Sequence, residues 1–253
     1  MTSAEPSPAL VREWAAYGIA AAAARFVPVP FVDDLVKRQA TRLAVVRTLT
    51  AHGRTYPPDA VEPLFDPEGF RSHRIMRAVT SVPRRVLLFP VRKYAAILGA
   101  VRGVPNDVLT VVLLGRAVHR FLAQGRLAGP DQAALREEAA VLRRAFDDAA
   151  GGADLPLLGG ALRDGLSEGR QLSRTAVEHA RRTFARGPAH RGEADSAANI
   201  EASIEADAGV QAGAARVEET LRRPEIATQL ARFDARLDAR LDALPASHGP
   251  TTV

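Results

Sequence analysis

The regular interruption of apolar, alanine-rich stretches by Val-Pro and by glycine is the feature of this sequence that most constrains its fold. An apolar stretch at about 8–26 runs into Val-Pro-Val-Pro, and Gly53 closes the next stretch. A residue before proline avoids the helical conformation, and glycine commonly follows the last turn of a helix. The spacing therefore predicts two helical hairpins, at about 9–53 and 84–126, the second closed by Gly125.

The rest of the sequence also favours helix, because runs of β-branched residues are few and short. We therefore expect an all-α helical bundle. Residues 54–70 contain four prolines and are predicted to form a loop or short turns. The predicted organisation is a tail at 1–8, a bundle domain at 9–186, a flexible linker at 187–212, an amphipathic helix at 213–245 and a tail at 246–253.

Glycines recur inside one predicted helix, which spans about 157–184. They are Gly160, Gly165 and Gly169. Each glycine inside a helix costs about 1 kcal/mol relative to alanine. The spacing therefore predicts that another helix approaches closely, or that the helix bends.

Charge is distributed unevenly along the chain. Residues 1–127 carry 18 basic and 9 acidic side chains, whereas residues 128–253 carry 16 basic and 20 acidic ones. Residues 71–126 hold 11 basic side chains and one acidic residue, Asp107. Two interpretations follow: the basic block attracts an anionic partner, or the acidic half of the chain neutralises it internally.

The basic side chains of this block alternate with leucine, valine and phenylalanine, a pattern that suits the surface of an anionic membrane. Aromatic residues are sparse in the block, so stacking on nucleic acid is not favoured. The longest uncharged run, Trp14 to Ala24, is too short to span a bilayer. The candidate anionic-surface residues are Arg71, Arg74, Arg77, Arg84, Arg85, Arg92, Lys93 and Arg102.

Near its C-terminus the chain carries a heptad-like seam of apolar residues: Ile226, Leu230, Phe233, Leu237, Leu241 and Leu244. Arginines line one flank of this predicted helix and aspartates line the other. Two copies in parallel would place arginine opposite aspartate, so a parallel homodimer is one interpretation. The alternative is that so short a seam packs onto the chain's own bundle.

Familiar catalytic and metal-binding patterns are missing from the sequence. Cysteine is absent, neither lysine lies in a phosphate-binding loop, and the six histidines lack the spacing of metal ligands. We therefore predict no cofactor, no metal and no enzyme activity. His119 is predicted to be a satisfied core histidine, His73 a residue of a solvated helix face, and Asp33 and Asp34 the cap and first turn of a helix.

The segment around Val-Pro-Val-Pro-Phe-Val-Asp-Asp, within Ala15–Gly53, resembles bacterial EcsC-like proteins. It is also similar to the helical domain of unknown function attached to some bacterial GTPases and inner-membrane proteins. The resemblance implies an all-helical, membrane-associated bacterial protein without a known enzymatic role. The 32 arginines against two lysines are also typical of a GC-rich bacterial genome.

Two functional hypotheses follow from these patterns. The first is a cytoplasmic, non-enzymatic helical protein that lies on the inner membrane surface and scaffolds or regulates a partner. The second is a soluble oligomeric interaction module that pairs through its C-terminal helix. An enzyme without a recognisable motif is the third and least favoured alternative.

Overall fold

The computed structural model describes residues 5–23, 32–66, 104–167, 201–202 and 204–243. Within these ranges the chain is helical and contains no strand, which confirms the predicted all-α fold. The named helices are α1 (Pro8–Ala23), α2 (Val32–Ala51), α3 (Pro58–Phe65), α6 (Val104–Ala123), α7 (Gln132–Gly151), α8 (Leu155–Ser167), α11 (Ala208–Leu221) and α12 (Pro224–Ala243).

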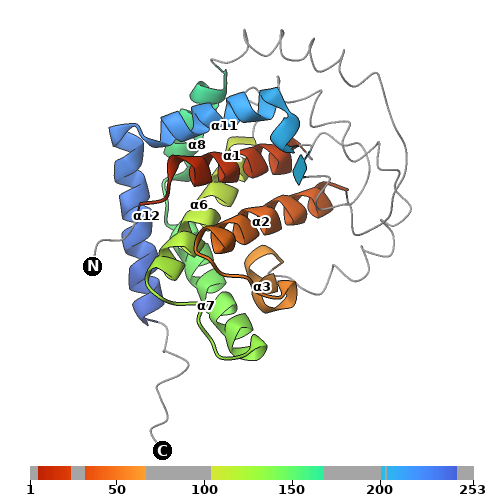
Figure 1. The fold of residues 1–253 in the computed structure, drawn as a ribbon. Coiled ribbons are helices and arrows are strands. Elements are labelled where there is room, and N and C mark those ends of the chain that lie inside the picture. Colours follow the sequence, from red (N-terminus) through yellow and green to blue (C-terminus); the bar gives the residue numbers. More distant parts are fainter. Residues whose placement is uncertain (1–4, 24–31, 67–103, 168–200, 203, 244–253) are drawn as a thin grey trace, which may run out of the picture.

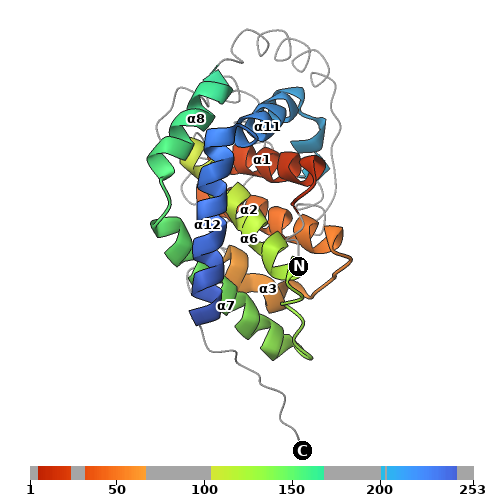
Figure 2. The same cartoon turned by 90° about the vertical axis from the view of Figure 1, so that its left-hand side faces the viewer.

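Helix α1 forms the centre of the bundle, with α11 on one side and α2 and α6 on the other (Figures 1 and 2). Every residue from Trp14 to Ala23 is buried. A helix that is apolar on all sides is stable only when it is covered on all sides. The apolar stretch that opens the chain is therefore the core helix of the bundle.

Small residues allow α1 and α6 to approach closely. A methyl group added at Gly18 would lie 2.9 Å from the backbone of Val108, and one added at Gly115 would lie 2.6 Å from the Trp14 ring. Contacts between real side chains are longer than this, so neither position has room for a larger residue. The two glycines thus set the distance between the helices.

The two glycines predicted to close the helical hairpins do end helices. Gly53 and Gly125 adopt φ angles of +66° and +75°, the left-handed conformation that ends a helix at glycine. The Asp131 side chain accepts a hydrogen bond from the Ala134 N–H and caps α7. The turn of the first predicted hairpin and the first helix of the second lie outside the described residues.

Helix α3 corrects the prediction of a loop at 54–70. Pro58 stands at the first helical position, where a missing N–H costs nothing. Pro63 lies inside the helix and cannot donate to the carbonyl of Asp59. Instead, Arg136 of α7 donates to that carbonyl at 2.8 Å, so a residue far along the chain completes this helix.

The C-terminal region also differs from the prediction. Two helices, α11 and α12, replace the single helix expected at 213–245, and α11 begins at Ala208, inside the predicted linker. Asp207 caps α11 by accepting hydrogen bonds from the N–H groups of Gly209 and Val210. The break falls before Pro224, because the residue preceding a proline disfavours helix.

One of the three glycines predicted to permit close approach does so. A methyl group at Gly165 would lie 2.4 Å from the hydroxyl oxygen of Thr220 on α11. Gly160, in contrast, has no atom within 4 Å of the position where a side chain would start. Gly169 lies outside the described residues.

We expect opposite effects from alanine at two helical glycines. Gly18→Ala forces a methyl group into the α6 backbone and should destabilise the fold by about 1–3 kcal/mol. Gly160→Ala fills open space and should stabilise it by up to about 1 kcal/mol, since alanine loses less entropy in a helix. Urea denaturation measures both changes. Equal effects at the two sites would contradict the close contact of α1 and α6.

Candidate functional site

Arginines on α6 and in the loop after it pair with aspartates on α12, although about 118 residues separate the partners. We call this set the Arg–Asp ladder. Its members are Arg116, Arg120, Arg126, Asp234, Asp238 and Asp242. It neutralises part of the basic block with carboxylates from the acidic half of the chain, as the internal interpretation of the charges predicted.

The innermost pair of the ladder is a buried, bidentate ion pair. Arg116 Nε donates to Asp234 Oδ1 at 3.0 Å, and Nη2 donates to Oδ2 at 2.8 Å. Only 13% of the arginine side chain and 9% of the aspartate side chain are exposed. Burial by itself lowers the pKa of Arg116, but its hydrogen bonds to Asp234 and Glu5 more than offset this and raise it.

The next rungs are more exposed. Arg120 holds both oxygens of Asp238, and Gln124 donates to the same carboxylate at 3.0 Å. The hydrogen bond from Arg120 lowers the pKa of Asp238. Arg126 reaches the mostly exposed carboxylate of Asp242 at 3.3 Å. Loss of one partner should therefore matter most at the inner end of the ladder, since breaking a buried pair leaves an uncompensated charge whereas exposed ion pairs contribute little.

The other flank of α12 also contacts the bundle. Arg236 Nη1 donates to the carbonyl of Gly152 at the end of α7, and Arg240 lies 4.0 Å from Asp148. Of the predicted seam, five residues are buried in the core of the same chain: Ile226, Leu230, Phe233, Leu237 and Leu241. Leu244 lies outside the described residues. In this structure the seam packs onto the chain's own bundle.

The eight candidate anionic-surface residues all lie outside the described residues, as does His73. Asp33 and Asp34 both fall in the first turn of α2, which begins at Val32, so the predicted first-turn position is observed but the predicted cap is not one of them. His119 is buried, with 8% of its surface exposed, and contacts His52 at the end of α2, as expected of a satisfied core histidine.

The two histidines form a direct ring-to-ring hydrogen bond between α2 and α6. His52 Nε2 and His119 Nδ1 lie 2.8 Å apart, so one ring donates its proton to the other. The Trp14 ring packs edge-on against His119, and its N–H donates to the buried Thr48 hydroxyl at 2.8 Å. Burial, then the neighbouring His119 and then Arg54 lower the pKa of His52.

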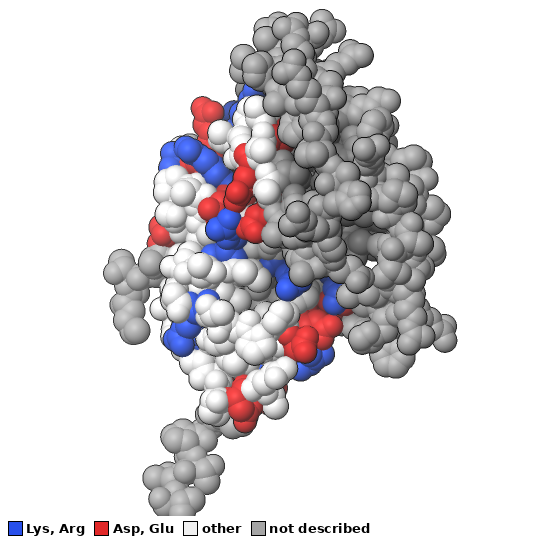
Figure 3. Space-filling view, turned by 45° about the vertical axis from the view of Figure 1, so that its right-hand side comes forward, with Lys and Arg blue, Asp and Glu red and all other residues white. Residues whose placement is uncertain are grey.

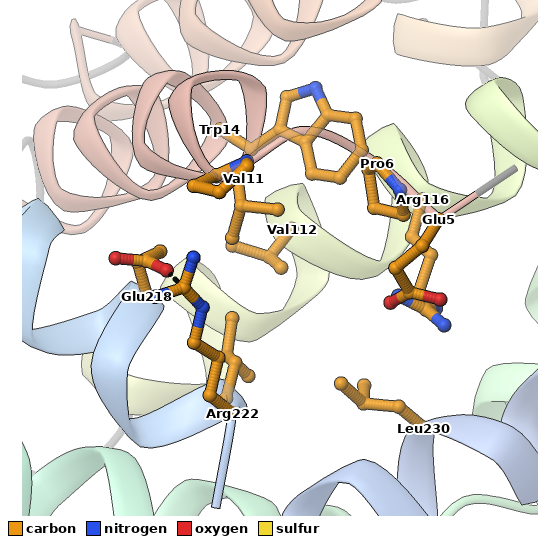
Figure 4. A pocket seen from close by; sticks show the side chains of 11 residues that line it. Glu5, Pro6, Val11, Trp14, Val112, Arg116, Glu218, Arg222 and Leu230 are labelled. Atoms are coloured by element: carbon orange, nitrogen blue, oxygen red, sulfur yellow. Dashed lines mark hydrogen bonds and ion pairs between the residues drawn. The ribbon is translucent and has the colours of Figure 1, made fainter.

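A pocket opens where α1, α6, α11 and α12 meet, with a volume of about 250 Å³ (Figure 4). Apolar side chains form much of its wall, including Val11, Trp14, Val112 and Leu230. Figure 4 shows a charged pair on either side: Glu218 with Arg222 in one place, and Glu5 with Arg116 in the other. Arg116 belongs to both the pocket and the ladder.

The carboxylate of Glu218 is the most buried charge in this pocket wall, with 5% of its side chain exposed. Arg12 Nε donates to its Oε2 at 3.3 Å. Arg222 Nε lies 2.6 Å from Oε1, but its N–H does not point at that oxygen, which accepts no hydrogen bond from the described residues. Two arginines thus share one carboxylate.

A second cluster of polar side chains joins α1 and α2 to Glu201 and Glu205. Arg47 donates to the Tyr17 hydroxyl at 3.2 Å and pairs with Glu201 and Glu205. Burial raises the pKa of Tyr17, and burial also raises that of Glu13 nearby. This group anchors a short segment that the sequence analysis assigned to a linker.

Sequence reasoning missed the pocket, the histidine pair and the Arg47 cluster, because no spacing rule links residues so distant in sequence. Among the described residues, no three carboxylate or histidine side chains gather as a metal site. None of the described helices has both the length and the apolar character needed to cross a bilayer.

Comparisons with known proteins identify no relative of this chain. No protein-family model, no curated protein and no solved structure matches this chain. The resemblance to EcsC-like proteins therefore stays a prediction.

The two ends of the Arg–Asp ladder should respond differently to neutralisation. Asp234→Asn removes the buried counter-charge of Arg116 and leaves it only the exposed Glu5, so it should destabilise the fold by about 3–5 kcal/mol. Asp242→Asn removes an exposed partner and should cost less than about 1 kcal/mol. Thermal and urea unfolding of the two variants test this. Similar losses would show that burial does not govern the ladder.

The histidine pair predicts a loss of stability in mild acid. The pKa of His52 is lower in the folded state than its unfolded value of about 6.5, so its contribution is complete above pH 6.5 and falls as the pH drops below it. His52→Gln should flatten the dependence of unfolding free energy on pH in this range. Fluorescence of Trp14, the single tryptophan, monitors unfolding. If His52→Gln leaves the pH dependence of the unfolding free energy unchanged, the loss of stability in acid does not come from the histidine pair.

Proposed function

We propose that this chain is a non-enzymatic helical protein that associates peripherally with the cytoplasmic face of an anionic membrane and scaffolds or regulates a partner there. The proposal rests on the way charge divides between the described residues and the segment 71–102. Nothing in it requires the apolar helix α1 to leave the core.

The described residues carry 19 lysines and arginines against 24 aspartates and glutamates, a net charge of −5. Residues 71–102 carry eight basic side chains and no acidic one. Figure 3 shows basic and acidic side chains intermixed on one face of the body rather than gathered by sign. A net negative charge on the described residues opposes binding to anionic lipid, and the segment 71–102 is the largest block of uncompensated positive charge in the sequence.

The Arg–Asp ladder refines which basic residues belong to the proposed surface. Arg116, Arg120 and Arg126 form the carboxyl-terminal end of the basic block, and α12 gives them an internal role. The proposal therefore rests on the other eight basic residues of the block, which lie in the segment 71–102. Between these eight lie apolar residues such as Val86, Leu87 and Phe89, which suit the boundary between headgroups and acyl chains.

The alternative, a homo-oligomer paired through α12, lacks comparable support. The seam and both flanks of α12 contact the chain's own helices, so pairing would require α12 to leave the bundle. The resemblance to membrane-associated EcsC-like proteins also favours the first hypothesis.

Vesicle co-sedimentation tests the proposal. The protein should sediment with vesicles that contain an anionic phospholipid and remain in solution with vesicles of phosphatidylcholine alone. Binding should weaken as salt rises, because screening shortens the range of the attraction. Since each basic side chain near the surface contributes about 1 kcal/mol, the triple change Arg71→Gln, Arg74→Gln and Arg77→Gln should lower binding about a hundredfold.

A matched control distinguishes the effect of the segment 71–102 on binding from the effect of net charge alone. Arg144, Arg163 and Arg232 are exposed on the described body. Changing all three to glutamine alters the net charge equally and should lower binding far less. If both triple variants bind alike, or if binding ignores lipid charge and salt, the proposal fails.

A further inference from the structure

The two arginines that share Glu218 retain unused hydrogen-bond donors. Each approaches the carboxylate through Nε, Arg12 at 3.3 Å and Arg222 at 2.6 Å. Neither guanidinium has another partner among the described residues, and the side chains are 53% and 60% exposed. The Nη groups are therefore accessible to an anion.

This trio also carries surplus positive charge, because one carboxylate neutralises only one of the two arginines. Glu218 is buried, so it orients the guanidinium groups without itself being accessible to a ligand. Arg12 is hydrogen-bonded to this carboxylate through Nε and Arg222 is ion-paired with it through Nε, so the Nη groups of both remain available, and paired Nη donors bind carboxylates and phosphates.

The wall beside Arg222 is apolar. Val11, Trp14 and Val112 line it on one side and Leu230 on the other (Figure 4). Arg116 on the opposite side is already paired through all three of its nitrogens with Asp234 and Glu5. The pocket thus combines one available anion-binding group with an apolar surface.

We propose that this pocket binds a small anion with an apolar tail, of the class of medium-chain carboxylates. The carboxylate pairs with the Nη groups of Arg222, Arg12 adds positive charge, and the tail lies against Trp14 and Val112. A volume of about 250 Å³ lies just below the usual range for drug-sized ligands, which favours a short tail.

A cationic ligand fits this site less well. Two carboxylates line the pocket: Glu5 is already paired with Arg116, and Glu218 offers only Oε1, the oxygen that accepts no hydrogen bond from the described residues. That oxygen is inaccessible to solvent, and Arg222 lies against it. Access would require breaking the ion pair. The inference goes beyond the proposed function, since it requires neither a membrane nor residues 71–102.

Titration of the full-length chain with octanoate, in the absence of vesicles and below micelle formation, tests the proposal. Octanoate should change the Trp14 fluorescence saturably, give a saturable heat in calorimetry, and raise the unfolding temperature. Octanol and octylammonium should bind at least tenfold more weakly because they lack the anion. Acetate should also bind at least tenfold more weakly because it lacks the tail.

Substitutions test whether octanoate binds at this pocket. Arg222→Gln should weaken octanoate binding tenfold or more, because it removes a charge-assisted hydrogen-bond donor. Arg223→Gln, a neighbour outside the pocket, should bind as the unchanged chain does. If Arg222→Gln fails to fold, Val11→Phe tests the apolar wall by filling it and should also abolish binding.

Three outcomes would overturn the proposal. They are equal affinity for octanoate and octylammonium, undiminished binding by the folded pocket variants, and the absence of any saturable heat or shift in unfolding temperature. Since vesicles are absent, failure here leaves the membrane proposal intact, and failure in co-sedimentation leaves this one intact.

Discussion

The close contact between α1 and α6 is the constraint on which the rest of the structure depends. Gly18 brings the α6 backbone against α1, and Gly115 lets the Trp14 ring lie flat on α6. Because α1 is buried on every side, α2 and α11 are positioned by it as well. The pocket depends on this geometry: Trp14 forms part of its wall, and Arg116 and Glu218 come from α6 and α11, which pack against α1.

Helix ends were largely predictable, because proline, glycine and capping aspartate act on their immediate neighbours. Gly53, Gly125 and Asp131 behave as their local chemistry requires. Helix α3 was not predictable in the same way. Its interior Pro63 leaves a carbonyl that Arg136 satisfies, and a partner 77 residues away from that carbonyl leaves no local signal.

In the candidate site, too, local features could be predicted from the sequence and long-range pairings could not. The arginine and aspartate flanks of α12 are visible in the sequence, but their partners are not. The ladder joins residues about 118 positions apart, and the histidine pair joins residues 67 apart. A residue pattern reveals that a helix face is charged. Tertiary packing alone decides whether the opposite charge comes from a second copy, a membrane or another helix of the chain.

Charge pairing inside the bundle also bears on what the surface can do. An arginine whose three nitrogens are all paired with carboxylates, as those of Arg116 are with the buried Asp234 and the exposed Glu5, contributes structure but little attraction for an external anion. An arginine ion-paired through Nε alone, as Arg222 is, keeps its Nη donors for a ligand. The number of basic residues is therefore a poor measure of anion binding, and the decisive quantity is how many guanidinium donors the fold leaves unoccupied.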